Sequence, residues 1–188
     1  MSRIPPARRA EYLPLFGPNA RIQEQVWAHS PRVALLYTNF MRELRRSTLL
    51  PSRLVELVRL RIAFHNQCRS CMSVRHHDGS NDGFNEGLVC SLAQPEEAVD
   101  LTEAERAALA FADLMASDHL SVTDATFQQL RLHFTDAQLV ELCVQIGAFV
   151  GFGRINAVLD MVDDLPEEFT RSDQPVTPWG TTPVLHSR

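Results

Sequence analysis

The chain has 188 residues, of which 45% are hydrophobic and 22% charged, a composition typical of one folded globular domain. Its formal net charge of -5 argues against nucleic-acid binding, which needs a concentrated basic face. All 18 basic residues are arginines, so covalent catalysis by a lysine amine is excluded.

The first residues lack the apolar core of a signal peptide, and no segment is expected to cross a bilayer. We therefore predict a cytoplasmic protein that has no membrane partner and no nucleic-acid partner. Its four cysteines would then lie in a reducing compartment, where a close pair is more often catalytic, redox-sensing or metal-binding than structural.

Breaker residues divide the chain into a domain and two arms. Residues 1–22 hold four prolines and are predicted to form an N-terminal arm. Residues 23–165 carry the helical periodicity of the domain. Residues 166–188 are rich in proline and threonine and are predicted to form a C-terminal tail, in which Trp179 is expected to contact this domain or a neighbour, or to be exposed.

Between the arms, apolar residues recur at spacings of three and four, and the alternation typical of strands is missing. Capping and proline signals start seven helices, the third of which ends by Gly79 and the last near Met161. These helices are expected to begin at Pro31, Pro51, near Cys68, near Asn81, at Thr102, at Thr123 and at Thr135.

The sharpest local signal is the pair Cys68 and Cys71 at the start of the third predicted helix. Two residues between cysteines on a helical turn bring the sulfurs close enough for a disulfide. A helix N-terminus, with Arg69 and Arg75 nearby, would stabilise a nucleophilic thiolate. Arg75 follows Cys71 by four residues and is predicted to share its helical face.

Glu56 is expected to join this pair through the hairpin that precedes it. A chain reversal near Asn66 would make the flanking helices antiparallel and place Glu56 opposite Arg75 or His76. A carboxylate, a cation and two thiols in one place would suit a proton relay that serves a peroxide-reducing cysteine.

The residues alone leave three interpretations open: redox or peroxidatic chemistry, inert structural thiols, and a metal site. Zinc would need the two thiols and two further ligands from His76, His77 and Cys90, without the second CxxC or spaced histidine pair that zinc sites usually show. The other two cysteines, Cys90 and Cys143, are predicted to be buried and inert.

The segment from Pro51 to Cys71 resembles the carboxymuconolactone decarboxylase superfamily, and more narrowly its alkylhydroperoxidase D branch. That branch carries Glu, eleven residues, Cys-x-x-Cys, three residues and His, and here Glu56 and Cys68 have eleven residues between them. The helix from Leu139 to Asn156 is also similar to the closing helix of the family. The resemblance covers roughly residues 30 to 165.

The resemblance implies an all-α, AhpD-like helical bundle of about six to eight helices with extended arms, assembled as a homotrimer or hexamer without metal or flavin. It also implies site roles. Cys71 would attack a hydroperoxide, Cys68 would resolve the sulfenic acid as a disulfide, and Glu56 would be the distal base. A thiol or a protein would donate the electrons.

One position departs from the family pattern, because Arg75 stands where the relay histidine belongs. Arginine stays protonated and cannot shuttle a proton, so we expect a nucleophilic thiol with an altered relay. His76 is a partial substitute, although a solvated helix face is the simpler interpretation of His76 and His77.

The leading functional hypothesis is thus a cysteine-based peroxidase or thiol–disulfide oxidoreductase that reduces organic hydroperoxides. Its catalytic residues would be Cys71, Cys68, Glu56, Arg75 and His76, with no cofactor and no metal. The alternatives are an acid–base enzyme like carboxymuconolactone decarboxylase, which would not need the thiols, and a non-catalytic thiol redox sensor.

Overall fold

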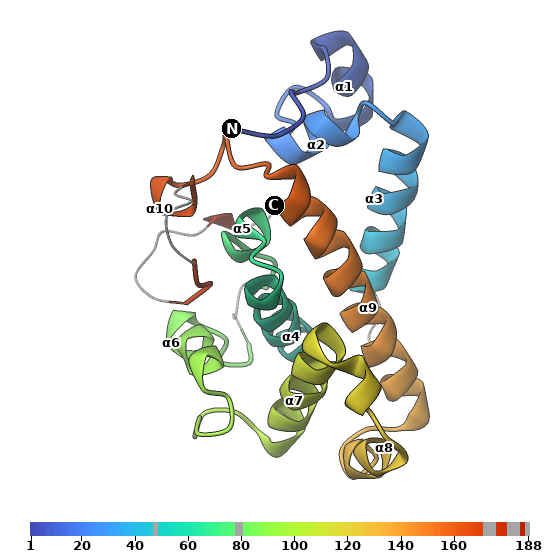
Figure 1. The fold of residues 1–188 in the computed structure, drawn as a ribbon, viewed down its shortest axis with the longest axis vertical. Helices are drawn as coiled ribbons and strands as arrows, with labels where there is room; N and C mark the ends of the chain where they lie inside the picture. Colours follow the sequence, from blue (N-terminus) through green and yellow to red (C-terminus); the bar gives the residue numbers. More distant parts are fainter. Residues whose placement is uncertain (47–48, 78–80, 171–175, 180–184, 187–188) are drawn as a thin grey trace.

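Three long helices form the core of the computed structural model, which describes residues 1–46, 49–77, 81–170, 176–179 and 185–186. These helices are α4 (Ser52–His65), α7 (Glu103–Ser117) and α9 (Asp136–Leu159), and α4 packs on both others (Figure 1). The sequence predicted all three. The all-α class is confirmed.

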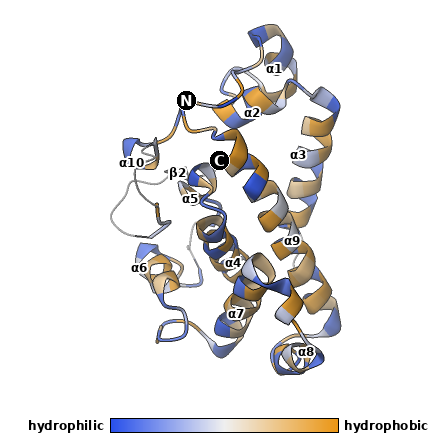
Figure 2. Ribbon diagram, in the orientation of Figure 1, coloured by the Kyte–Doolittle hydropathy of each residue, from blue (hydrophilic) through white to orange (hydrophobic). Residues whose placement is uncertain are grey.

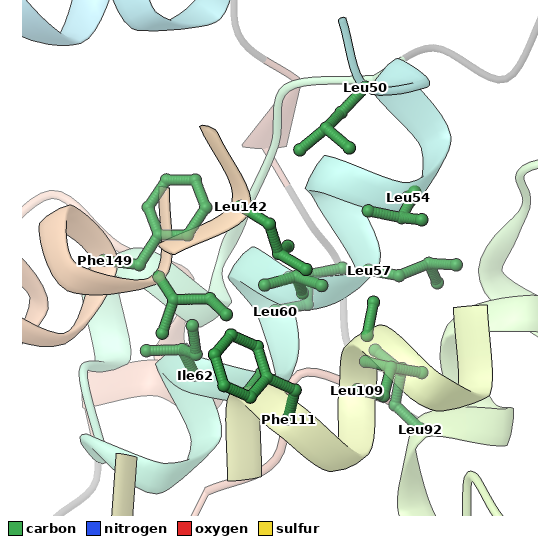
Figure 3. Close-up of a cluster of buried hydrophobic side chains, with 14 of the residues drawn as sticks. Leu50, Leu54, Leu57, Leu60, Ile62, Leu92, Leu109, Phe111, Leu142 and Phe149 are labelled. Carbon is green, nitrogen blue, oxygen red and sulfur yellow. The ribbon is translucent and has the colours of Figure 1, made fainter. Parts of the chain in front are cut away.

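The core forms where the apolar stripes of these helices meet. Leu57, Leu60 and Ile62 of α4 are fully buried. Burying these side chains on two sides of α4 removes their apolar surface from water and stabilises the fold. Figure 3 shows them between α7 and α9, with Leu109 and Phe111 on one side and Leu142 and Phe149 on the other.

Capping boxes start two of the core helices. The hydroxyl of Thr102 accepts a hydrogen bond from the backbone N–H of Glu105, and that of Thr135 accepts one from Gln138. Each such cap stabilises a helix by about 1 kcal/mol. Both helix starts could be predicted because the capping residues lie within four positions of one another in the sequence.

The sequence predicted no segment able to cross a bilayer, and α9 departs from this expectation by its length and composition. Its 24 residues are long and apolar enough, by length and composition alone, to cross a membrane, and Figure 2 shows hydrophobic residues along much of it. In the structure α9 packs against α4 and α7, and it buries Leu142, Ile146 and Phe149 in the core.

The described residues contain ten α-helices, more than the six to eight expected, because the arms form helices of their own. The helices α1 (Arg9–Phe16) and α2 (Ile22–Trp27) lie near the N-terminus, and α10 (Glu167–Thr170) lies in the C-terminal tail. The α-helices that complete the set, besides the three core helices, are α3 (Pro31–Arg46), α5 (Arg69–Met72), α6 (Glu86–Cys90) and α8 (Asp124–Leu130). Two short 3-10 turns cover Ser91–Ala93 and His119–Ser121.

The third predicted helix is much shorter than expected. It was predicted to run from Cys68 to Gly79, but α5 spans only Arg69–Met72, and Gly79 lies outside the described residues. The chain then extends as β1 (Val74–Arg75), which pairs in parallel with β2 (Leu185–His186). Arginine side chains take up the carbonyls of Met72 and Val74, so these groups need no helical partner.

The C-terminal tail returns to its own domain. Trp179 lies on Phe64 of α4 with ring centroids 4.8 Å apart, and Val176 donates its N–H to the Gln67 side chain. Of the three alternatives open for Trp179, contact with its own domain is therefore the one found.

Candidate functional site

A cavity of about 980 Å³ lies between α3, α4, α9 and the N-terminal segment that contains α2. Aromatic side chains, Trp27, Tyr37 and Phe152, form much of one wall, and they contact one another with centroid distances from 4.6 to 6.5 Å. Glu56, Cys71 and His76 line the same cavity, so three of the five residues predicted for the site meet there.

The two cysteines differ in their access to this cavity. Cys68 and Cys71 are joined as a disulfide, in line with their spacing. Cys68 is completely buried, whereas Cys71 is half-buried and is part of the cavity wall. A small molecule in the cavity therefore reaches Cys71 and not Cys68.

Local structure explains the buried position of Cys68. Gln67, at φ 48°, turns the chain after α4, and Cys68 then donates its N–H to the carbonyl of Ala63. Cys68 is the N-cap of α5, and its sulfur accepts a hydrogen bond from the backbone N–H of Cys71 at 3.3 Å. Because α5 has only four residues, the thiolate stabilisation expected from a helix N-terminus is small.

Glu56 is paired with a residue that the sequence analysis did not single out. Arg59, three residues later on α4, holds both carboxylate oxygens at 2.7 Å. The same guanidinium donates to the carbonyl of Cys71 at 2.7 Å and to that of Val74. Arg59 thus connects Glu56 to the backbone that carries the cavity-facing sulfur.

This pairing fixes the charge of Glu56. Burial raises the pKa of the carboxyl, but the charge and hydrogen bonds of Arg59, with the N–H of His76, outweigh burial and lower the pKa of Glu56 to about 2. A carboxylate held this firmly stays ionised at neutral pH and is a weak proton acceptor.

His76 meets Glu56 across the hairpin, through its backbone: its N–H donates to Oε1 of Glu56 at 2.8 Å. His76 lines the cavity and is an exposed residue. Desolvation by the cavity walls and the charge of Arg59 lower the pKa of His76 below its usual range. The imidazole is therefore neutral at neutral pH, and its lowered pKa makes it a weak base.

Arg75 was predicted to share a helical face with Cys71, which is wrong, and of the two residues expected opposite Glu56, Arg75 or His76, the structure places His76 there. Because the helix ends before it, Arg75 lies in β1, and it is not among the residues that line the cavity. Its side chain is 1% exposed and binds both oxygens of Glu86 at 2.8 Å and the carbonyls of Met72 and Pro178. Arg69 is also directed elsewhere, to Asp160 and to the carbonyl of Thr170.

Three residues near Cys71 escaped the sequence analysis as site residues. Asn156 of α9 places Nδ2 at 4.0 Å from the sulfur of Cys71, and the indole N–H of Trp27 donates to Oδ1 of the same amide at 3.3 Å. Burial raises the pKa of Tyr37, an effect that Asn156 partly offsets through a side-chain hydrogen bond. These residues come from three distant segments, so no spacing in the sequence reveals them.

Of the remaining predicted residues, His77 also lines the cavity, whereas Cys90 and Cys143 do not. Cys90 is exposed, contrary to prediction, and Cys143 is half-buried. His77 pairs with Asp82 at 2.8 Å. Within the part of the chain that the structure describes, no three histidine, cysteine, aspartate or glutamate side chains gather as a metal site.

No protein-family model matches the chain. Two curated, uncharacterized proteins of Mycobacterium tuberculosis, one from strain CDC 1551 and one from H37Rv, are each 32% identical to it over 123 residues, or 64% of this chain. The aligned part is 43% of either relative, so the chain spans less than half the length of the curated relatives it matches.

Solved structures share the fold more fully. A protein of unknown function from Agrobacterium tumefaciens, named as a candidate antioxidant defence protein AhpD, is 26% identical with a TM-score of 0.61, over 71% of this chain and 91% of that one. An alkylhydroperoxidase AhpD core protein, an uncharacterized peroxidase-related protein from Ralstonia eutropha, is 20% identical with a TM-score of 0.67, over 90% and 94%.

A debrominase crystallised with a tribromopyrrole is 20% identical with a TM-score of 0.68, over 86% of this chain and 91% of that one. At this identity the likeness shows the fold alone. The Agrobacterium structure, at 26% identity, is in line with the AhpD-like resemblance of the sequence, and the other two structures show the shared fold.

Proposed function

We propose that this chain is an AhpD-like thiol peroxidase of the carboxymuconolactone decarboxylase superfamily, which reduces organic hydroperoxides through Cys71 and Cys68. The observation that carries the proposal is the unequal access of the two sulfurs. Cys71 faces a large cavity, as an attacking thiolate must, and Cys68 is buried behind it within bonding distance, as a resolving thiol should be.

The reaction proceeds in two thiol steps and one reductive step. The Cys71 thiolate attacks the hydroxyl oxygen of ROOH, the O–O bond breaks, and the alkoxide takes up a proton to leave as ROH. Cys68 then attacks the sulfenic acid of Cys71, releasing water and forming the disulfide. Two electrons from an external thiol or dithiol restore both cysteines and leave that reductant as a disulfide.

His76 is the residue best suited to move the proton. Its neutral imidazole lines the cavity, and because its lowered pKa makes it a weak base, we assign it to passing the proton from the Cys71 thiol to the departing alkoxide during the attack rather than to holding that proton. Glu56, locked by Arg59, holds the backbone N–H of His76 and is assigned to orienting this residue. Arg75 has no part in the relay.

The size of the cavity supports an organic substrate. A volume of about 980 Å³ exceeds what hydrogen peroxide needs, and it falls in the range of pockets that bind drug-sized molecules. Its aromatic wall of Trp27, Tyr37 and Phe152 favours a substrate with an apolar body.

The acid–base alternative has less support. An enzyme of that type would use Glu56 as a base, yet both oxygens of this carboxylate are bound by Arg59 and its pKa is lowered to about 2. A substrate screen with both cysteines replaced by serine separates the two functions, because acid–base turnover would survive that change.

The proposal is tested by steady-state consumption of cumene hydroperoxide with dithiothreitol as the reductant. Wild-type protein should consume the hydroperoxide, Cys71→Ser should lose this activity, and the matched control Cys90→Ser, at an exposed cysteine outside the cavity, should retain it. Equal consumption by wild type and Cys71→Ser would remove the assignment. A disulfide that forms without turnover would favour the redox sensor.

A further inference from the structure

The side-chain amide of Asn156 occupies a position beside the reactive sulfur that the mechanism above leaves unused. Asn156 is only 5% exposed, it lines the cavity, and its Nδ2 lies 4.0 Å from Sγ of Cys71. The effect of a buried amide on a neighbouring thiolate depends on which end of the amide faces the sulfur. Nδ2 donates hydrogen bonds and would stabilise the thiolate, whereas Oδ1 only accepts them and would not.

Trp27 decides this orientation. The indole nitrogen can only donate, so its hydrogen bond at 3.3 Å identifies the Asn156 atom that it meets as Oδ1. With Oδ1 engaged, the amide presents its Nδ2 end to the sulfur, and it also hydrogen-bonds the side chain of Tyr37. Trp27 is itself held by stacking on Tyr37, with ring centroids 4.7 Å apart and planes 11° from parallel.

We infer that Asn156 is a catalytic residue of the thiol site, whose N–H stabilises the Cys71 thiolate, and that Trp27 is the positioning residue which keeps the amide in that orientation. An N–H donor stabilises an ionised sulfur more than a neutral one, which increases the thiolate fraction at neutral pH. Asn156 thereby supplies from α9 the stabilisation that neither the four-residue helix α5 nor Arg75, which is bound to Glu86 and to backbone carbonyls, provides.

Trp27 also gives the N-terminal segment a role in the site. Trp27 ends α2, more than forty residues before Cys71, and α2 contacts α3. The aromatic wall and the amide orientation thus depend on a segment that the CxxC motif does not include. Other groups that influence the sulfur are Glu56 and Arg59 from α4, Tyr37 from α3, and His76 after β1, with the Arg69–Asp160 ion pair behind it.

The catalytic role assigned to Asn156 rests on the proposed peroxidase function, but the test of its effect on Cys71 does not require peroxide turnover. Reduced full-length protein is alkylated with iodoacetamide across a range of pH, and the Cys71 peptide is quantified by mass spectrometry, which separates it from Cys68, Cys90 and Cys143. The readout is the midpoint of the pH profile and the alkylation rate at neutral pH.

Asn156→Asp keeps the size of the side chain but replaces the donor with a carboxylate. We expect the midpoint for Cys71 to rise and the rate at neutral pH to fall by about tenfold, as expected for a lost charge-assisted hydrogen bond. Asn39→Asp makes the same change at an exposed asparagine of α3 and should leave the profile unchanged. Equal profiles for the two variants would overturn the inference.

Trp27→Phe keeps the stacked ring and removes only the N–H donor, so it tests the positioning role even where Asn156→Asp fails to fold. The freed amide can then present either end to the sulfur, and we expect a rate decrease of about threefold, with an unchanged thermal midpoint. An unchanged Cys71 profile in Trp27→Phe would overturn the positioning role. A shifted profile without peroxide turnover would uphold the inference and contradict the peroxidase proposal.

Discussion

Glu56 and Arg59 form a buried ion pair, with side chains 4% and 10% exposed, that determines much of the site at the residue scale. Such a pair contributes most through the cost of breaking it, because the remaining charge is left buried without a partner. The pair also aligns two backbone segments, since Arg59 binds the Cys71 carbonyl and Glu56 binds the His76 N–H.

Glu56→Gln should therefore lower the free energy of unfolding by about 3 kcal/mol at neutral pH. The pKa of Glu56 falls from 4.5 to about 2 on folding, so its stabilisation is complete above pH 4.5 and is lost as the pH falls toward 2. Urea unfolding of wild type and variant at several pH values should show a difference that is constant above pH 5 and shrinks below 4.5.

The control for this prediction is Glu43→Gln, which breaks an exposed ion pair with Arg42 and should change stability by less than about 0.5 kcal/mol. If Glu56→Gln lowered the free energy of unfolding by as little as this control, or if the difference between wild type and variant did not vary with pH, the Glu56–Arg59 pair would not stabilise the fold.

The sequence predicted part of the site for reasons that lie in local geometry. Counting residues on either side of a reversal near Asn66 placed Glu56 opposite Arg75 or His76, and in the structure its carboxylate accepts the His76 N–H. The spacing of three residues to Arg59 was a usable signal that was missed. Asn156 could not be paired with Cys71 from sequence, because no local pattern links residues 85 positions apart.

At the scale of elements, β1 explains why Arg75 is a structural residue. Helical periodicity continues past Ser73, but the carbonyls of Met72 and Val74 are bound by arginine side chains and the chain extends to pair with β2. By contrast, α7 and α9 begin as predicted because their caps are encoded within four residues. Helix ends that depend on distant partners are not readable from local sequence.

The bonds of Arg75 give a prediction about the C-terminal tail. Arg75→Met keeps the aliphatic stem but loses the bonds to Glu86 and to the carbonyl of Pro178. The segment 176–179 should then exchange its amide hydrogens faster, and hydrogen–deuterium exchange measured by mass spectrometry reports this directly.

Arg131→Met, which removes an exposed ion pair with Asp136, serves as the comparison and should leave exchange in the tail unchanged. If the tail of Arg75→Met exchanged as in wild type while Cys71 lost reactivity, Arg75 would belong to the thiol site after all.

At the scale of the whole molecule, an apolar stripe on α3 faces outward. Val33, Leu36 and Phe40 are 49%, 62% and 42% exposed, although their spacing places them on one helical face. Monomeric proteins rarely expose such stripes. We propose that copies of this chain associate through α3, in keeping with the homotrimer or hexamer that the family resemblance implies.

Leu36→Glu should therefore dissociate the assembly, because a charge would be buried between copies. Sedimentation velocity at micromolar concentration should show an oligomer for wild type and a single copy for this variant. Leu132→Glu, at another highly exposed leucine, should remain oligomeric. A wild type that sediments as one copy would contradict the proposed association.

The central claim, that Cys71 is the attacking sulfur and Cys68 the resolving one, is tested most directly by trapping the intermediate. Reduced Cys68→Ser protein is treated with stoichiometric tert-butyl hydroperoxide in the presence of dimedone, and the labelled peptide is identified by mass spectrometry. We predict a dimedone adduct on Cys71 in Cys68→Ser, and no adduct on Cys68 in Cys71→Ser. An adduct on Cys68 in Cys71→Ser that forms as fast as the one on Cys71 would contradict the account.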